Sequence, residues 1–66
     1  MTFKELRKNK YRTAADLAEK LCIPSARIAK WEQGTAAPKI RDLRAVAKAL
    51  GVSLNTLVEA LEETAG

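Results

Sequence analysis

The segment from Thr13 to Gly34 constrains the fold most, because it divides into two short amphipathic stretches separated by a break. In the first stretch, Leu17 and Leu21 are four residues apart, which places them on one face of a helix. The break contains Pro24, which lacks a backbone N–H and fits only near the start of a helix. Gly34 predicts the end of the second helix, since glycine tolerates a positive φ. The pattern favours short helices joined by tight turns.

Hydroxyl residues mark three predicted helix starts. Thr2 is followed by Glu5 and Thr13 by Asp16, and each pair fits the capping box, in which the hydroxyl and the acidic side chain bond reciprocally to backbone N–H groups. Ser53 precedes an apolar run and is a candidate cap for a last helix. We therefore expect helices to begin at residue 2 or 3, just after residue 13, and just after residue 53.

The second stretch, residues 25–34, has two different faces when its residues are placed 100° apart. Ile28, Trp31 and Glu32 fall on one side. Trp31 can be interpreted as a base-stacking side chain, but its position three residues after Ile28 favours the core. The opposite side is small, polar and basic, with Ala26, Lys30 and Gln33. Small residues allow a helix to enter a DNA major groove, and Lys or Gln reach base edges.

The chain resembles the phage repressor/Cro-type (XRE-like) helix-turn-helix family over nearly its whole length. The matching residues are Phe3-Lys4-Glu5-Leu6-Arg7, Leu17-Ala18-Glu19-Lys20-Leu21, Ile23, Ile28, Trp31-Glu32, Gly34 and Ala49-Leu50-Gly51-Val52-Ser53-Leu54. This resemblance implies a compact all-α fold of five helices, with the helix-turn-helix at helices 2 and 3. It also implies binding of double-stranded DNA without catalysis.

The resemblance assigns roles to individual side chains. Base contacts fall on Ser25, Ala26 and Lys30, while Arg27 and Gln33 are placed for phosphates or outer bases. Arg7 is expected to pair with Glu32 and to offer its guanidinium to a phosphate. Further backbone or minor-groove contacts are expected at Arg12, the backbone N–H of Ala14, Thr35 and Lys39.

Several positions depart from the family's usual residues. Tyr11 stands where Gly is common, and we expect it to turn inward, whereas Ala14 replaces a Gln that holds the DNA backbone in many relatives. Cys22 also occupies a usual Gly position; a tolerated turn residue is favoured over a redox sensor. Pro24 replaces the usual cap of helix 3, so either Ser25 caps that helix or Pro24 lies in its first turn.

The C-terminal half completes the predicted fold. Pro38 is expected to open a fourth helix that runs to about Leu50 and stops at Gly51. Its predicted buried stripe is Ile40, Leu43, Val46, Ala47 and Leu50. The last helix carries four apolar residues, and we expect Leu54, Val58 or Leu61 to form a two-fold dimer contact. Residues 1–66 are predicted to form one domain, with residues 62–66 as a frayed end.

Composition narrows the function classes. The net charge is +4, but residues 49–66 contain three acidic and no basic side chains, so a basic body ends in an acidic segment. This distribution favours an oriented contact with a polyanion, although a solvated surface explains it too. A single cysteine and no histidine exclude an intrachain disulfide, the usual zinc sites and histidine-based catalysis. Neither an enzyme activity nor a cofactor is expected.

We therefore predict a sequence-specific DNA-binding regulator, in particular a repressor that acts as a homodimer on a palindromic operator. The sequence contains neither a transmembrane run nor a signal peptide, so a cytoplasmic, nucleoid-associated protein is expected, and no small-molecule ligand is evident. The alternative is a protein-interaction or antitoxin-like module that uses the apolar face of the last helix.

Overall fold

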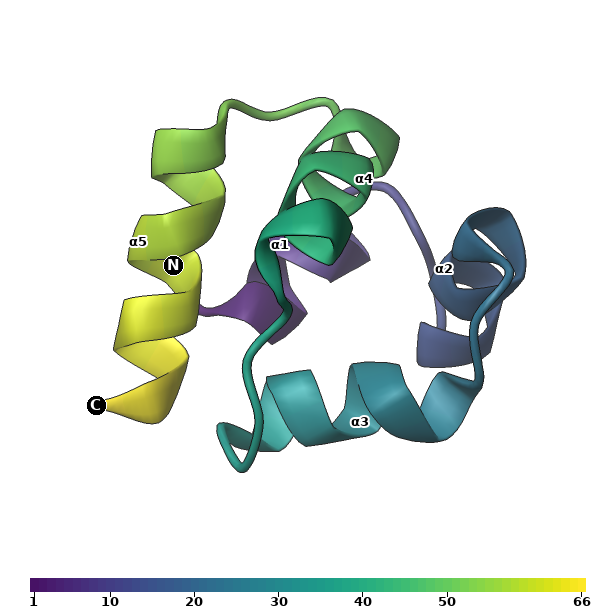
Figure 1. The fold of residues 1–66 in the computed structure, drawn as a ribbon, viewed down its shortest axis with the longest axis horizontal. Helices are drawn as coiled ribbons and strands as arrows, with labels where there is room; N and C mark the ends of the chain where they lie inside the picture. The colour runs from purple at the N-terminus through teal and green to yellow at the C-terminus, as the bar shows by residue number, and fades with distance from the viewer.

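A computed structural model describes residues 1–66 and contains five α-helices and no strands (Figure 1). The helices are α1 (Phe3–Lys8), α2 (Ala14–Leu21), α3 (Ser25–Gln33), α4 (Ile40–Leu50) and α5 (Leu54–Ala65). In Figure 1, α2 and α5 lie at opposite ends of the molecule, with α1 and α4 between them and α3 along the lower side. The predicted all-α fold with five helices is confirmed.

The three predicted hydroxyl caps are all present. The hydroxyl of Thr13 accepts from the backbone N–H of Asp16 at 3.1 Å, and Thr2 and Glu5 form the same reciprocal box at the start of α1. The hydroxyl of Ser53 accepts from the backbone N–H of Thr56 at 3.1 Å. These local bonds fix three helix starts and so determine the lengths of the connections between helices.

The turn between α2 and α3 passes through a left-handed residue. Cys22 has φ 59° and ψ 42°, and it is the only non-glycine residue with positive φ. This left-handed conformation explains why glycine is favoured at position 22, since it costs a residue with a Cβ atom about 1 kcal/mol to adopt it. Cys22 is exposed and makes a tolerated turn, as expected.

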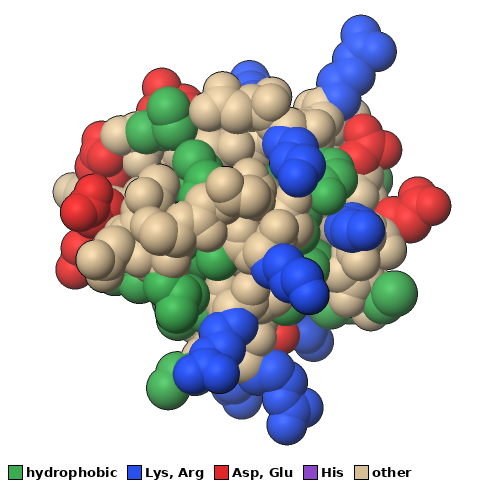
Figure 2. Space-filling view, turned by 90° about the horizontal axis from the view of Figure 1, so that it is seen from above, with side chains coloured by type: hydrophobic (Ala, Val, Ile, Leu, Met, Phe, Trp, Pro, Cys, Tyr) green, Lys and Arg blue, Asp and Glu red, His purple; other side chains and the backbone are tan.

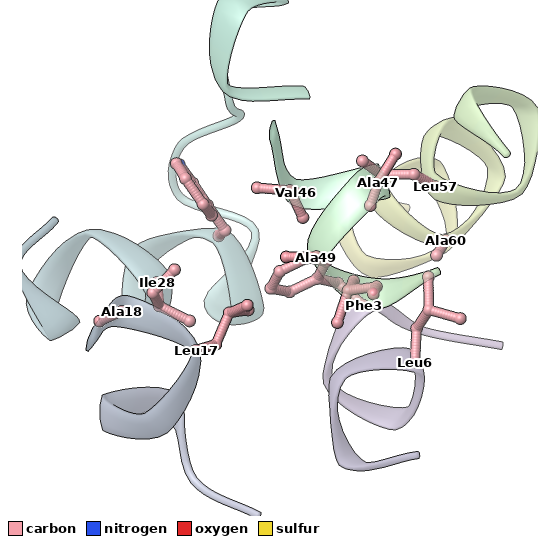
Figure 3. Packing of buried hydrophobic residues seen from close by; sticks show 12 residues of the cluster. Phe3, Leu6, Leu17, Ala18, Ile28, Val46, Ala47, Ala49, Leu57 and Ala60 are labelled. Carbon is pink, nitrogen blue, oxygen red and sulfur yellow. The ribbon is translucent and has the colours of Figure 1, made fainter. Parts of the chain in front are cut away.

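One core joins all five helices. Twelve buried apolar residues form it, namely Phe3, Leu6, Leu17, Ala18, Ile28, Trp31, Val46, Ala47, Ala49, Leu50, Leu57 and Ala60. Leu17 and Ile28 meet where α2 packs on α3 (Figure 3). The rings of Phe3 and Trp31 pack edge to face, with centroids 6.2 Å apart and planes at 83°. Trp31 is therefore a core residue, as its spacing predicted.

The start of α4 differs from the prediction. Ile40 was expected in the buried stripe, but its side chain is 75% exposed. Pro38 does not open the helix either, because Lys39 occupies the N-cap position and α4 begins at Ile40. Pro38 is itself buried, two residues before the first residue of α4.

The C-terminal residues that were predicted as a frayed end continue the last helix in the structure. Helix α5 continues through Ala65, and the hydroxyl of Thr64 accepts from the backbone N–H of Phe3 at 2.9 Å. The N-terminal ammonium group forms an ion pair with Glu63. A Cβ on Gly34 would lie only 3.0 Å from the carbonyl oxygen of Thr64, so the last turn of α5 packs closely on the end of α3. These long-range contacts hold residues 62–65 in the helix.

Candidate nucleic-acid interface

Helix α3 has one buried face and one exposed face, as the 100° spacing predicted. Ile28 and Trp31 are 0% and 2% exposed and fix the helix on the core. The remaining candidates for DNA contact on this helix are all exposed: Ser25, Ala26, Arg27, Lys30 and Gln33. Burial of two large side chains thus orients this face toward solvent.

The start of α3 follows neither of the two expected arrangements. Pro24 occupies the N-cap position with ψ 140° and contributes no side-chain hydrogen bond, and Ser25 is the first helical residue. Because no side chain caps this end, the first N–H groups of α3 lack side-chain partners. The hydroxyl of Ser25 is exposed and is not used for capping.

An open groove runs beside the exposed face of α3. It is lined by Pro24, Ala26, Arg27, Lys30, Trp31, Ala36, Ala37, Lys39 and Asp42. The groove brings together four of the predicted contact residues, namely Ala26, Arg27 and Lys30 of α3 and Lys39 at the N-cap of α4. Its small alanine side chains leave room for another molecule, and three cations line it.

Three groove residues were not predicted from the sequence as parts of the site. Ala36 and Ala37 were recognised only as loop residues, and Asp42 was not singled out. Asp42 lies in the first turn of α4, where a carboxylate complements the helix dipole. Its negative charge makes the start of α4 less favourable for a phosphate than Lys39 alone suggests.

The predicted pair between Arg7 and Glu32 is present and largely buried. Nε of Arg7 donates to Oε2 of Glu32 at 2.5 Å, and Nη1 donates to the carbonyl oxygen of Tyr11 at 3.0 Å. The side chains of Arg7 and Glu32 are 5% and 13% exposed. This burial leaves little guanidinium surface for the DNA phosphate that we had expected Arg7 to contact. In this structure Arg7 positions the end of α3.

The start of α2 carries the other backbone-contact candidates. Arg12 is exposed and forms no ion pair, and Ala14 is the first residue of the helix, so its N–H has no intrahelical partner. Tyr11 turns inward as predicted, and its hydroxyl donates to the carbonyl oxygen of Ala49 at 3.2 Å. That bond anchors the connection between α1 and α2, from which Arg12 projects.

Thr35 lies at the opposite end of α3. Its side chain is exposed, and its hydroxyl donates to the carbonyl oxygen of Lys30 at 3.3 Å. The hydroxyl therefore already has a partner within the protein, at the point where α3 ends in the left-handed Gly34. The structure places Thr35 beside the end of α3, whereas Lys39 lies within the groove.

A model of the Cro/C1-type helix-turn-helix family matches residues 3–57. The chain belongs to this family. The match runs from the first residue of α1 to Leu57, so it includes the complete helix-turn-helix of α2 and α3. No curated protein and no solved structure gave a significant match.

Membership in the helix-turn-helix family establishes the general activity. Domains of this family bind DNA and are not enzymes. No group of three or more metal-ligating side chains is present, and none of the helices combines the length and apolar character needed to cross a membrane.

Proposed function

We propose that this protein is a transcriptional repressor that binds a palindromic operator in double-stranded DNA as a homodimer. The observation that carries the proposal is the exposed face of α3, which combines small residues with Lys30 beside an open basic groove. A recognition helix needs this combination, because small side chains permit close approach and long polar ones reach base edges.

The proposed base contacts come from three side chains of α3. Lys30 donates to guanine O6 or N7, and the free hydroxyl of Ser25 donates or accepts. Ala26 contacts a thymine methyl group. With only one long basic side chain in this set, the protein also depends on DNA shape for its specificity.

The proposed backbone contacts surround this set on two sides. Arg27 and Lys39 approach phosphates from the groove, and Gln33 approaches from the end of α3. Arg12 and the N–H of Ala14 approach from the start of α2, where the helix dipole favours an anion. Thr35 completes the set beside the end of α3. These contacts supply most of the affinity, so binding falls steeply with salt.

The proposed dimer contact uses the apolar side of α5. Leu54 and Val58 are 43% and 38% exposed, and Leu61 is half-buried. A two-fold contact through this side would present two copies of α3 to successive major grooves about 34 Å apart. A dimer bound in this way represses by occupying the promoter and excluding polymerase.

The same exposed side of α5 supports a second candidate function. Leu54 and Val58 would equally suit a different protein, as in an antitoxin-like module. The two candidates differ in what Lys30 does, because only the repressor needs this side chain.

The deciding experiment is selection of binding sites from a random duplex pool at two salt concentrations. We expect an enriched palindrome with half-sites about one helical turn apart. The Lys30→Glu variant should lose enrichment, while Lys4→Glu, an equal charge change at an exposed position of α1, should retain it. Weak binding without enrichment would reject the operator-binding proposal and favour a protein partner at α5.

A further inference from the structure

A second open groove is formed by α2, α4 and the connection after α1. It is lined by Lys10, Tyr11, Lys20, Leu21, Ala45, Lys48 and Ala49. None of these residues lines the groove beside α3. We call this site the three-lysine groove, after Lys10, Lys20 and Lys48.

The three lysines come from different elements. Lys10 belongs to the connection between α1 and α2, Lys20 to the last turn of α2 and Lys48 to the last turn of α4. All three side chains are exposed, and none forms an ion pair. No acidic residue lines the groove. The fold therefore brings three uncompensated positive charges to one place.

Helix dipoles account for only part of this arrangement. A cation in the last turn of a helix is favourable, which explains one lysine at the end of α2 and one at the end of α4. The ammonium of Lys10 is a second cation at the end of α4, since it lies 3.7 Å from the point that a Cβ on Gly51 would occupy. The repulsion among the three charges is relieved by a bound anion.

The shape of the groove favours an extended anion. The groove is open, and its floor is made by the half-buried Tyr11 and Leu21 with Ala45 and Ala49. Arg44 is exposed one turn before Lys48 on α4, so the positive surface continues beyond the groove. Figure 2 shows Lys and Arg side chains in a band across the molecule seen from above, with acidic side chains at both the left and the right edge. A phosphodiester backbone fits such a band better than a compact ion does.

The position of the three-lysine groove separates it from the DNA contact proposed for α3. Helix α4 contributes Asp42 to the first groove and Ala45, Lys48 and Ala49 to the second. Three residues separate Asp42 from Ala45, which is about 4.5 Å along a helix axis. The rest of each lining comes from different elements, because α3 and the loop after it line the first groove, whereas α2 and the connection after α1 line the second.

We propose that the three-lysine groove binds the backbone of a second DNA duplex, so that one protein links two DNA segments. This inference rests on the proposed function, because α3 holds the first duplex. The second contact reads no bases, since the groove offers only ammonium groups and an apolar floor.

The test is a two-duplex capture assay at low salt. A biotinylated duplex that carries the selected site is fixed to beads, protein is added, and a fluorescent duplex of random sequence is then offered. We expect wild-type protein to stay on the beads and to capture the fluorescent duplex. The K20Q/K48Q variant should stay on the beads but capture at least about fivefold less, because it loses two phosphate contacts. The matched K4Q/K8Q variant removes the same charge from exposed positions of α1 and should behave as wild type.

Each stage of the assay reports on a different proposal. Failure of wild-type protein to stay on the beads would reject DNA binding by α3. Retention without capture of the second duplex, or equal capture by wild type and K20Q/K48Q, would overturn the three-lysine proposal. Weaker retention of K20Q/K48Q on the first duplex would also overturn it, because the groove would then contact that same duplex.

Discussion

At the scale of single residues, the ion pair between Arg7 and Glu32 joins α1 to the end of α3, the helix proposed to contact DNA bases. Glu32 follows the buried Trp31, and its partner comes from α1, 25 positions earlier in the chain. A largely buried pair adds little net stability, but removal of one partner leaves a buried charge without compensation. The pair therefore fixes the end of α3 more than it strengthens the fold.

We predict that Arg7→Met lowers the free energy of unfolding by about 3 kcal/mol, since it leaves the carboxylate of Glu32 buried and unpaired. This loss is comparable with the total stability of about 3–5 kcal/mol expected for a domain of this size. Urea unfolding followed by circular dichroism measures the change. The R7M/E32L double variant should recover much of the loss, and a double variant no more stable than R7M would contradict this account.

The residue contacts that sequence reasoning predicted are mostly local or have strong chemical preferences. The capping box of Thr13 and Asp16 depends only on their spacing of three residues. Glu32 lies on the inward side of its helix, where its carboxylate needs a cation as partner. The burial of Arg7 was not predictable in this way. It depends on the hydrogen bond from Nη1 of Arg7 to the carbonyl oxygen of Tyr11, and this bond forms only when the connection between α1 and α2 is folded.

At the scale of elements, the ends of helices were the hardest features to predict. A helical wheel shows that Ile40 shares a face with Leu43, but not that Ile40 is 75% exposed while Leu43 is half-buried. The last turn of α5 is stabilised by Phe3, 61 positions away, so no local pattern reveals it. In both cases tertiary contacts decided the outcome.

The hydrogen bond between Thr64 and Phe3 gives the first prediction for an element. Thr64→Val keeps the shape of the side chain but removes the acceptor for the partly buried N–H of Phe3. We expect the free energy of unfolding to fall by about 1 kcal/mol. Thr64→Ser, which keeps the hydroxyl, should lose much less. Equal stability of the Val and Ser variants in urea unfolding would show that α5 frays at this point.

The capping box of α1 gives a prediction on pH. The hydrogen bond from the backbone N–H of Thr2, followed by that from its hydroxyl, lowers the pKa of Glu5 below its ordinary value of 4.5. Because the pKa of Glu5 is lower in the folded state than in the unfolded state, the ionised carboxylate stabilises the fold. This stabilisation is complete above the unfolded-state pKa and is lost as the pH falls through the folded-state pKa. The difference in Tm between wild type and Glu5→Gln should therefore be constant near neutral pH and should approach zero below pH 4.5.

The control for this pH prediction is Glu19→Gln, which alters an exposed carboxylate that accepts no hydrogen bond from another side chain or from the backbone. Its Tm difference from wild type should vary less between neutral and acidic pH. A Glu5→Gln difference that grows as pH falls would show that the carboxylate does not stabilise the start of α1.

At the scale of the whole molecule, charge is distributed unevenly around the core. The groove beside α3 and the three-lysine groove are both rich in basic side chains, whereas α5 contains three glutamates and no basic residue. A polyanion is therefore attracted to the body of the domain and repelled from α5. This asymmetry leaves α5 free for contact with a second protein while DNA is bound.

The proposed dimer is the prediction that depends on the whole molecule. We expect wild-type protein to bind a full palindrome roughly a hundredfold more tightly than a half-site, because the second half-site is bound from an already anchored dimer. The L54K/V58K variant should lose this advantage yet keep half-site affinity. Both positions are more than one-third exposed, so the lysines should leave the helical signal and Tm near those of wild type.

Two further measurements make this prediction specific to the apolar side of α5. Glu59→Gln changes the charge by one unit at an exposed position about 140° around the helix from Leu54, and it should retain the full-site advantage. Sedimentation of wild-type protein should show a dimer that L54K/V58K converts to a monomer. If L54K/V58K remains dimeric and still prefers the full site, the two subunits meet elsewhere, and the exposed leucine and valine are left for a different partner.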